Sequence, residues 1–215
     1  MSVKGLDQNQ PYDPRMHAGG GGYYQMAFKS GLITGIAANS PLFSFRWAPA
    51  AKSDGSGRTY RCQLKFIKVD AVTMTAFGTA QLCDFYTYCA KTWSASDTGG
   101  TQVLPAAGDQ KRQKQYADSL FVGGGDIRIA TTGALSAGTR TLEAQPFSSF
   151  KFWSGAIGSS MSPPVLEEWD EHHVPMVFEP NQGVIIQNGT AFGATGVVQL
   201  WVDLMWMEEP EPGAW

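Results

Sequence analysis

The stretch VPMVFEPNQGVIIQNGTAFGATGVVQLWVDLMWME, residues 174–208, decides the fold class of this chain. Its final part alternates strictly between apolar side chains and a mixed set, which is the period of a β-strand with one buried face. The expected buried positions are Val198, Leu200, Val202, Leu204 and Trp206. A turn signal at residues 180–183, Pro-Asn-Gln-Gly, precedes it, because proline starts turns and glycine permits a positive φ. We therefore expect three strands here, at the centre of a β-sandwich.

The longest expected strand, residues 59–77, changes its buried face partway along. Two sets of apolar residues occupy opposite parities: Cys62, Leu64 and Phe66, then Ile67, Val69 and Ala71. A shift of one residue moves every following side chain to the other face of a sheet. The pattern predicts a bulge, or a move from one sheet to the other, near Phe66-Ile67.

Alternating segments with turn residues between them recur along the chain, with Phe43, Phe45 and Trp47 as a clear example. About eight to ten strands and no clear long helix favour an antiparallel β-sandwich of jelly-roll type with an extended N-terminal arm. The expected division is an arm over residues 1–22, a sandwich domain over 23–208 and a C-terminal tail over 209–215.

The strand expected at residues 81–93, QLCDFYTYCAKTW, is apolar or aromatic on both faces. Such a strand is covered twice, once by the core and once by something else. The glycine-rich arm carries apolar side chains of its own, which either order on a neighbouring subunit or belong to a disordered terminus. From these features we expect the following residues to bind a partner: Tyr12, Met16, Phe85, Tyr86, Tyr88, Trp93 and Trp201.

The composition excludes several classes of function. Charged residues make up 16% of the 215 residues and the net charge is −3, so the chain lacks the basic footprint expected of a nucleic-acid-binding protein. No run reaches the roughly 18 apolar residues of a membrane helix, and the first residues lack the apolar segment of a signal peptide. We expect no nucleic-acid partner, no membrane contact and synthesis in a cytosol.

The three cysteines, Cys62, Cys83 and Cys89, do not form a disulfide framework on this interpretation. In one extended strand, Cys83 and Cys89 would lie about 20 Å apart, which is far beyond the reach of a bridge. We expect all three to be reduced, buried and structural.

No motif for catalysis or for a cofactor stands out, so we expect neither catalytic residues nor a cofactor. Gly-x-Ser-x-Gly is absent from the sequence. The densest set of ligand-type groups is the acidic segment 167–173, with adjacent His172 and His173. Adjacent residues of a strand point to opposite faces, so the two histidines cannot chelate one ion from regular β structure. A soluble acidic loop is the expectation, with a carboxylate-bound cation as the open alternative.

Several stretches resemble a group of uncharacterised structural proteins of tailed bacteriophages. They are SASDTGG (94–100), DIRIATTGALSAGTRTLEAQP (126–146), VPMVFEPNQGVIIQN (174–188) and GATGVVQLWVDLMW (193–206). The opening HAGGGGYYQ and the following SGLITGIAANSPLFSFRW also look like that group. Their order along residues 18–208 carries the resemblance, since each motif alone is a common turn or strand pattern.

The resemblance implies a virion component of β-sandwich type, from the head or the head–tail region, and no enzyme. The leading hypothesis is a decoration or cement protein that binds the phage head and stabilises contacts between capsid subunits. Its partners would be the major capsid protein or other virion proteins, and it would itself form a trimer or dimer. Two alternatives stay open: a tail, neck or fibre-base component, and a carbohydrate-binding jelly roll in which sugar rings stack on Trp and Tyr.

Overall fold

Twelve β-strands form the regular structure of the described part of the chain. The computed structural model describes residues 22–49, 60–105, 119–121, 126–160, 165–168 and 176–210, with only the backbone for 165–168 and for Pro210. The strands are β1 (Gly22–Lys29), β2 (Pro41–Trp47), β3 (Tyr60–Thr75), β4 (Leu82–Trp93), β5 (Thr101–Gln102), β6 (Asp126–Ile129), β7 (Arg140–Leu142), β8 (Ser148–Trp153), β9 (Val165–Glu168), β10 (Met176–Phe178), β11 (Gln182–Asn188) and β12 (Val197–Pro210).

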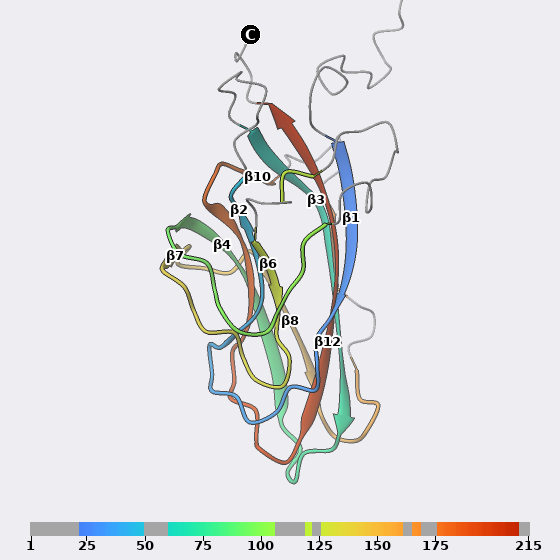
Figure 1. The fold of residues 1–215 in the computed structure, drawn as a ribbon. Helices are drawn as coiled ribbons and strands as arrows, with labels where there is room; N and C mark the ends of the chain where they lie inside the picture. Colours follow the sequence, from blue (N-terminus) through green and yellow to red (C-terminus); the bar gives the residue numbers. More distant parts are fainter. Residues whose placement is uncertain are drawn as a thin grey trace, which may run out of the picture.

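The strands form two sheets in which every pairing is antiparallel. Sheet A has the order β1-β12-β3-β10, and β9 pairs with β3 beside β10. Sheet B has the order β5-β6-β2-β11-β4-β7, and β8 also pairs with β4. The long strands β1, β3 and β12 run much of the length of the molecule (Figure 1).

The connectivity is that of a jelly roll. Successive strands β1, β2, β3 and β4 alternate between sheets A and B, and so do β10, β11 and β12. The neighbours β1-β12-β3-β10 face the neighbours β2-β11-β4-β8, which gives the eight strands of two interlocked Greek keys. The short strands β5, β6 and β7 are additions between β4 and β8. The predicted antiparallel jelly-roll sandwich is therefore confirmed.

Strand β12 supplies the predicted stripe of core residues. Val198, Leu200, Val202, Leu204 and Trp206 are all fully buried. The strand lies between β1 and β3, so its inward face reaches the middle of the core from the centre of sheet A. It continues to Pro210, two residues past the expected end of the domain.

A bulge in β3 explains the predicted change of phase. Met205 pairs with Phe66 and Trp206 pairs with Leu64, which leaves Lys65 as an extra residue in β3. Leu64 and Ile67 are buried, whereas Lys65 and Phe66 are only half-buried. The bulge therefore lies one to two residues before the expected position, and the strand stays in sheet A.

The turn before β11 uses a different residue from the one expected. The positive φ belongs to Asn181, at 68°, and not to glycine. Gly183 lies inside β11, where an added Cβ would collide with the carbonyl oxygen of Phe45 on β2. Glycine at this position serves close packing of two strands, and asparagine tolerates the left-handed conformation.

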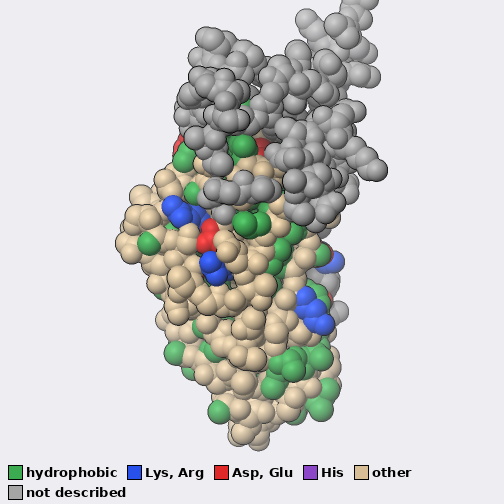
Figure 2. All heavy atoms as spheres, in the orientation of Figure 1, with side chains coloured by type: hydrophobic (Ala, Val, Ile, Leu, Met, Phe, Trp, Pro, Cys, Tyr) green, Lys and Arg blue, Asp and Glu red, His purple; other side chains and the backbone are tan. Residues whose placement is uncertain are grey.

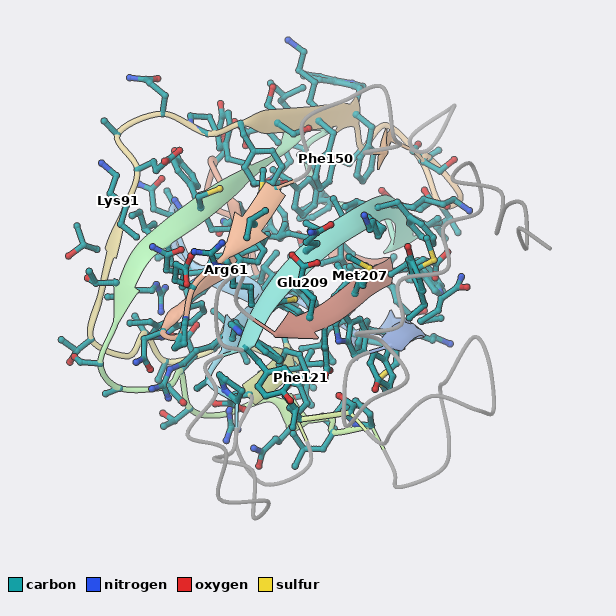
Figure 3. All side chains as sticks on the ribbon, turned by 90° about the horizontal axis from the view of Figure 1, so that it is seen from above. Arg61, Lys91, Phe121, Phe150, Met207 and Glu209 are labelled. Carbon is teal, nitrogen blue, oxygen red and sulfur yellow. The ribbon has the colours of Figure 1, made fainter. Side chains whose placement is uncertain are left out.

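The core contains two groups of aromatic rings. Phe121, from the chain between β5 and β6, lies 4.8 Å from Phe45 and 5.4 Å from Trp206 between ring centroids. Phe150 stacks on Phe85 in the other group at 4.9 Å. Phe121 and Phe150 lie on opposite sides in the view from above (Figure 3). The two groups fill the space between the sheets at separate places.

Candidate functional site

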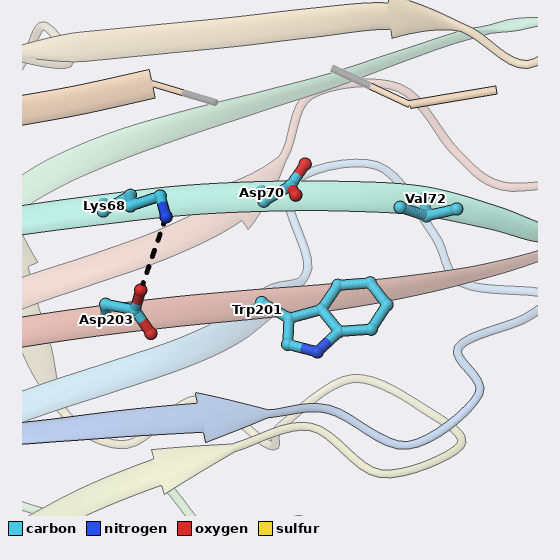
Figure 4. Close-up of a pocket in the computed structure, with 5 residues that line it drawn as sticks. All are labelled: Lys68, Asp70, Val72, Trp201 and Asp203. Carbon is cyan, nitrogen blue, oxygen red and sulfur yellow. Dashed lines mark ion pairs between the residues drawn. The ribbon is translucent and has the colours of Figure 1, made fainter. Parts of the chain in front are cut away.

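The outer face of sheet A carries a hollow floored by a tryptophan. Residues of β12 and β3 that alternate with the buried stripe point outward and surround a space of about 290 Å³. They are Lys68, Asp70, Val72, Trp201 and Asp203, shown in Figure 4. The strand register sets Trp201 opposite Asp70 and Asp203 opposite Lys68.

Charged groups of both signs surround the indole ring. Lys29 of β1 pairs with Trp201, and its Nζ lies 5.7 Å from the ring centroid, a cation–π contact. Lys68 Nζ lies 3.7 Å from Asp203 Oδ2, an ion pair between two partly exposed side chains. Asp70 Oδ1 accepts a hydrogen bond of 2.8 Å from the backbone N–H of Ala71. The hollow thus combines a flat apolar surface with hydrogen-bond acceptors and donors.

A second feature is a set of exposed apolar side chains at one end of the sandwich. We call Met74, Leu82, Trp153 and Ile157 the apolar rim. Trp153 is 60% exposed and Ile157 is 70% exposed, against 41% for Met74 and 38% for Leu82. Hydrophobic side chains gather at the lower end of the face seen in Figure 2, near the end of β3.

Backbone contacts hold the rim together although its residues come from distant segments. Leu82 pairs directly with Trp153 across β4 and β8, so both side chains point to the outside of sheet B. The loop after β8 then reaches β3, where Gly158 N–H donates to Thr73 O at 2.8 Å, next to Met74. The rim therefore spans both sheets at this end of the molecule.

The outer face of sheet B is partly covered by the chain itself. Ile185 of β11, Ala90 and Trp93 form a small buried cluster with Leu142 of β7 packed against it. The segment after β4 bonds to the segment before β7, since Ser94 N–H donates to Thr139 O at 2.9 Å. The second cover expected over residues 81–93 is thus intramolecular at the Trp93 end, and the strand does not need an outside partner there.

A buried ion pair fixes this cover. Arg140 packs over Trp93, 5.5 Å from the ring centroid, and pairs with the fully buried Asp97. The N–H of Gly138 donates to Asp97 Oδ1 at 2.8 Å. Burial raises the pKa of Asp97, and the Gly138 N–H and the Arg140 charge oppose that rise. A buried charge with these partners is a structural element of the cover.

The residues expected to bind a partner lie in different environments. Trp201 lies in the hollow, and Tyr86 and Tyr88 are half-buried on the outer face of β4. Phe85 is fully buried in the core and Trp93 is buried under its own chain, so neither side chain is on the surface. Tyr12 and Met16 lie outside the described residues.

The rim residues are missing from the sequence-based set. Alternation places Leu82 and Met74 on outward faces, but it does not say that outward apolar residues from β3, β4 and β8 meet at one end. Ile157, a large apolar residue in the glycine-containing segment SGAIGSS (154–160), is the signal that could have indicated an exposed site.

Other groups of interest give little chemistry. All three cysteines are free, as expected. Cys62 and Cys83 are buried as expected, whereas Cys89 is only half-buried. Among the described residues no group of three or more His, Cys, Asp or Glu could hold a metal ion. Side chains of the acidic segment 167–173 lie outside that part of the chain. Within the same part, no helix is long and apolar enough to cross a membrane.

Comparisons with known proteins give no family. No family model matches the sequence, and no curated protein matches it. The solved structures that match include the human polyomavirus 6 VP1 pentamer, at 11% identity over 86% of this chain and 94% of that chain, with a TM-score of 0.18. A TM-score this low carries no argument, so the assignment of function rests on the residues and topology of this chain.

Proposed function

We propose that this chain is a virion structural protein that binds the outside of a phage head and holds capsid subunits together. The observation that carries the proposal is the apolar rim, which leaves four large apolar side chains in water at one end of the sandwich. Exposed apolar groups of this kind mark interaction sites. The ordered resemblance to phage structural proteins, together with the low content of charged residues, supports a capsid as the partner.

The rim suits adhesion by many copies. Complete burial of one large apolar side chain contributes about 1.5–3 kcal/mol, and the rim residues are already partly buried. Burial of the rim therefore contributes a few kcal/mol per copy, much of which the cost of association offsets. A dimer or trimer of the chain, bound across a joint between subunits, would add these contributions. The proposed role is structural, without a catalytic step or a cofactor, and its place is the virion.

The test uses particles assembled without this protein and purified protein added back. Trp153→Ser with Ile157→Ser removes the most exposed part of the rim, and we expect it to weaken binding to the particles at least tenfold. Val177→Ser is the matched control, because Val177 is also exposed, at 38%, but lies on β10 away from the rim. The number of bound copies per particle is measured by sedimentation and quantitative gel analysis.

Head stability separates the proposal from the other virion roles. Particles without the protein should release DNA at a lower temperature than complete particles, and wild-type protein should restore the difference. Unchanged head stability together with lost attachment to cells would reject the cement role and favour a tail, neck or fibre-base component. Equal binding by the rim variant and the wild type would remove the rim from the contact.

A further inference from the structure

We propose that the Trp201 hollow binds a neutral saccharide, with one pyranose ring stacked on the indole and its hydroxyl groups bonded to Asp70 and Asp203. The inference rests on the geometry of sheet A and does not depend on the role of the apolar rim. No described feature of the core or of the cover on sheet B uses this hollow.

The hollow contains a flat aromatic platform. Trp201 is half-buried on the outer face of the central strand of sheet A. In Figure 4 the indole ring is seen face-on over β12, and Val72 lies on the neighbouring strand β3. A flat ring that lies along the sheet offers its π-face to the C–H groups of a sugar, which carry the complementary partial charge.

The indole ring is held in place before any ligand binds. The exposed side chain of Lys29 reaches over the ring from β1 and is displaced when a sugar stacks there, and Val72 and Asp70 line the same hollow from β3. Both neighbouring strands are hydrogen-bonded to β12 along the whole segment. An aromatic side chain on rigid strands loses little conformational entropy when a ligand covers it.

The charges around the hollow favour a neutral ligand. Two carboxylates, Asp70 and Asp203, line the hollow with one ammonium group, Lys68, and Lys29 lies beside it at the indole ring, so the hollow carries no excess positive charge to attract an anion. Carboxylates accept hydrogen bonds from hydroxyl groups, and Lys68 donates. The Lys68–Asp203 pair is long, at 3.7 Å, and partly exposed, so hydroxyl groups can replace it at small cost.

The size of the hollow agrees with a short saccharide. Its volume of about 290 Å³ lies near the lower end of the range for small-molecule sites. A mono- or disaccharide fits this space, and a longer chain would extend along the open face of the sheet.

The experiment uses the full chain on an array of neutral and charged glycans, followed by titration calorimetry with the neutral disaccharides retained. We expect millimolar or tighter binding of at least one neutral saccharide and none of sialylated glycans or inorganic phosphate. Trp201→Ala should weaken that binding at least tenfold, whereas Trp201→Phe should keep it within a few fold. The rim variant Trp153→Ser with Ile157→Ser should bind the saccharide like the wild type.

Circular dichroism and thermal unfolding check that the Trp201→Ala protein is folded. If it is not, Asp70→Asn with Asp203→Asn tests the same site, and we expect at least fivefold weaker binding. Binding that survives these changes, preference for charged glycans, or no binding to any neutral saccharide on the array would overturn the proposal. The rim variant is tested in both assays. A failure of saccharide binding therefore does not decide the adhesion proposal, which the particle-binding assay tests separately.

Discussion

Glu208 shows how one buried carboxylate organises part of the core. Its oxygens accept hydrogen bonds from Ser119 Oγ at 2.6 Å, from the N–H of Leu120 at 2.8 Å and from Trp206 Nε1 at 2.9 Å. The side chain is fully buried. The carboxylate therefore ties residues 119–121 to β12 and positions Phe121 among the core rings.

We predict that Glu208→Gln lowers the free energy of unfolding by about 2 kcal/mol, because the amide has one acceptor oxygen and its NH₂ group faces a buried donor. Urea unfolding followed by tryptophan fluorescence measures the change. Glu143→Gln, at an exposed position, is the control and should stay within about 0.5 kcal/mol of the wild type. Equal stability of the two variants would contradict the anchoring role of Glu208.

At the scale of elements, the bulge in β3 keeps two halves of a strand in phase with the core. Lys65 is the extra residue, and Leu64 and Ile67 on either side of it are both buried. Removal of Lys65 would restore a regular alternation at this point, whereas removal of a residue between Ile67 and Thr73 would turn one half of the strand over.

We predict that deletion of Lys65 gives a folded protein that loses no more than about 2 kcal/mol, within the usual range for single changes. Deletion of Asp70, in the regular part of β3, should prevent soluble folding, because it turns one half of the strand over. Either Ala71 and Thr73 or Ile67 and Val69 then leave the core. Soluble yield and circular dichroism compare the two deletions. A folded Asp70 deletion would show that the register of β3 is not fixed by burial.

The sequence was sufficient to predict features that depend on the pattern of a single strand. Strict alternation in β12 identified its five core residues, and the change of parity in β3 located the bulge within two residues. It was insufficient for β4, since apolar side chains on both faces do not reveal whether the second cover is another molecule or the same chain. Trp93 lies under Arg140, which is 47 residues later in the sequence, and no local pattern records that contact.

At the scale of the whole molecule, we expect the three thiols to make the free energy of unfolding depend on pH in the alkaline range. Burial raises the pKa of Cys83 to about 11 and that of Cys89 to about 12, and it also raises the pKa of Cys62. In the unfolded chain a thiol ionises near pH 8.5, so above that pH the unfolded state binds fewer protons than the native state. The thiols therefore contribute fully to the free energy of unfolding below about pH 8.5. This contribution is lost as the pH rises through their native pKa values.

We predict that the urea midpoint falls between pH 8 and pH 10.5, and that it falls less in a Cys83→Ala, Cys89→Ala variant. Lysines and tyrosines titrate in the same range, so the difference between the two proteins isolates the thiols. Parallel pH profiles would show that the native thiols ionise as freely as those of the unfolded chain.

The sequence could not predict the hollow and the rim as sites, because each is assembled from segments that lie far apart in the chain. Trp201 was recognised as an outward aromatic residue, but its carboxylate neighbour Asp70 lies 131 residues earlier in the sequence and meets it only through the β3–β12 pairing. The rim likewise needs the loop after β8 to reach Thr73. Both surfaces are products of the topology and not of any single segment.

The order of strands in the two sheets has a consequence for synthesis of the chain. In sheet A, β1 and β3 are not paired with each other, and each pairs with β12, which lies between them. In sheet B, β2 and β4 are likewise joined only through β11. Both central strands belong to residues 182–210. On a ribosome, earlier segments therefore emerge as separate hairpins and edges, with their apolar faces in water. We expect the sandwich to close only after both strands have left the exit tunnel. Until then the unpaired edges of the earlier strands are open to aggregation or to chaperone binding.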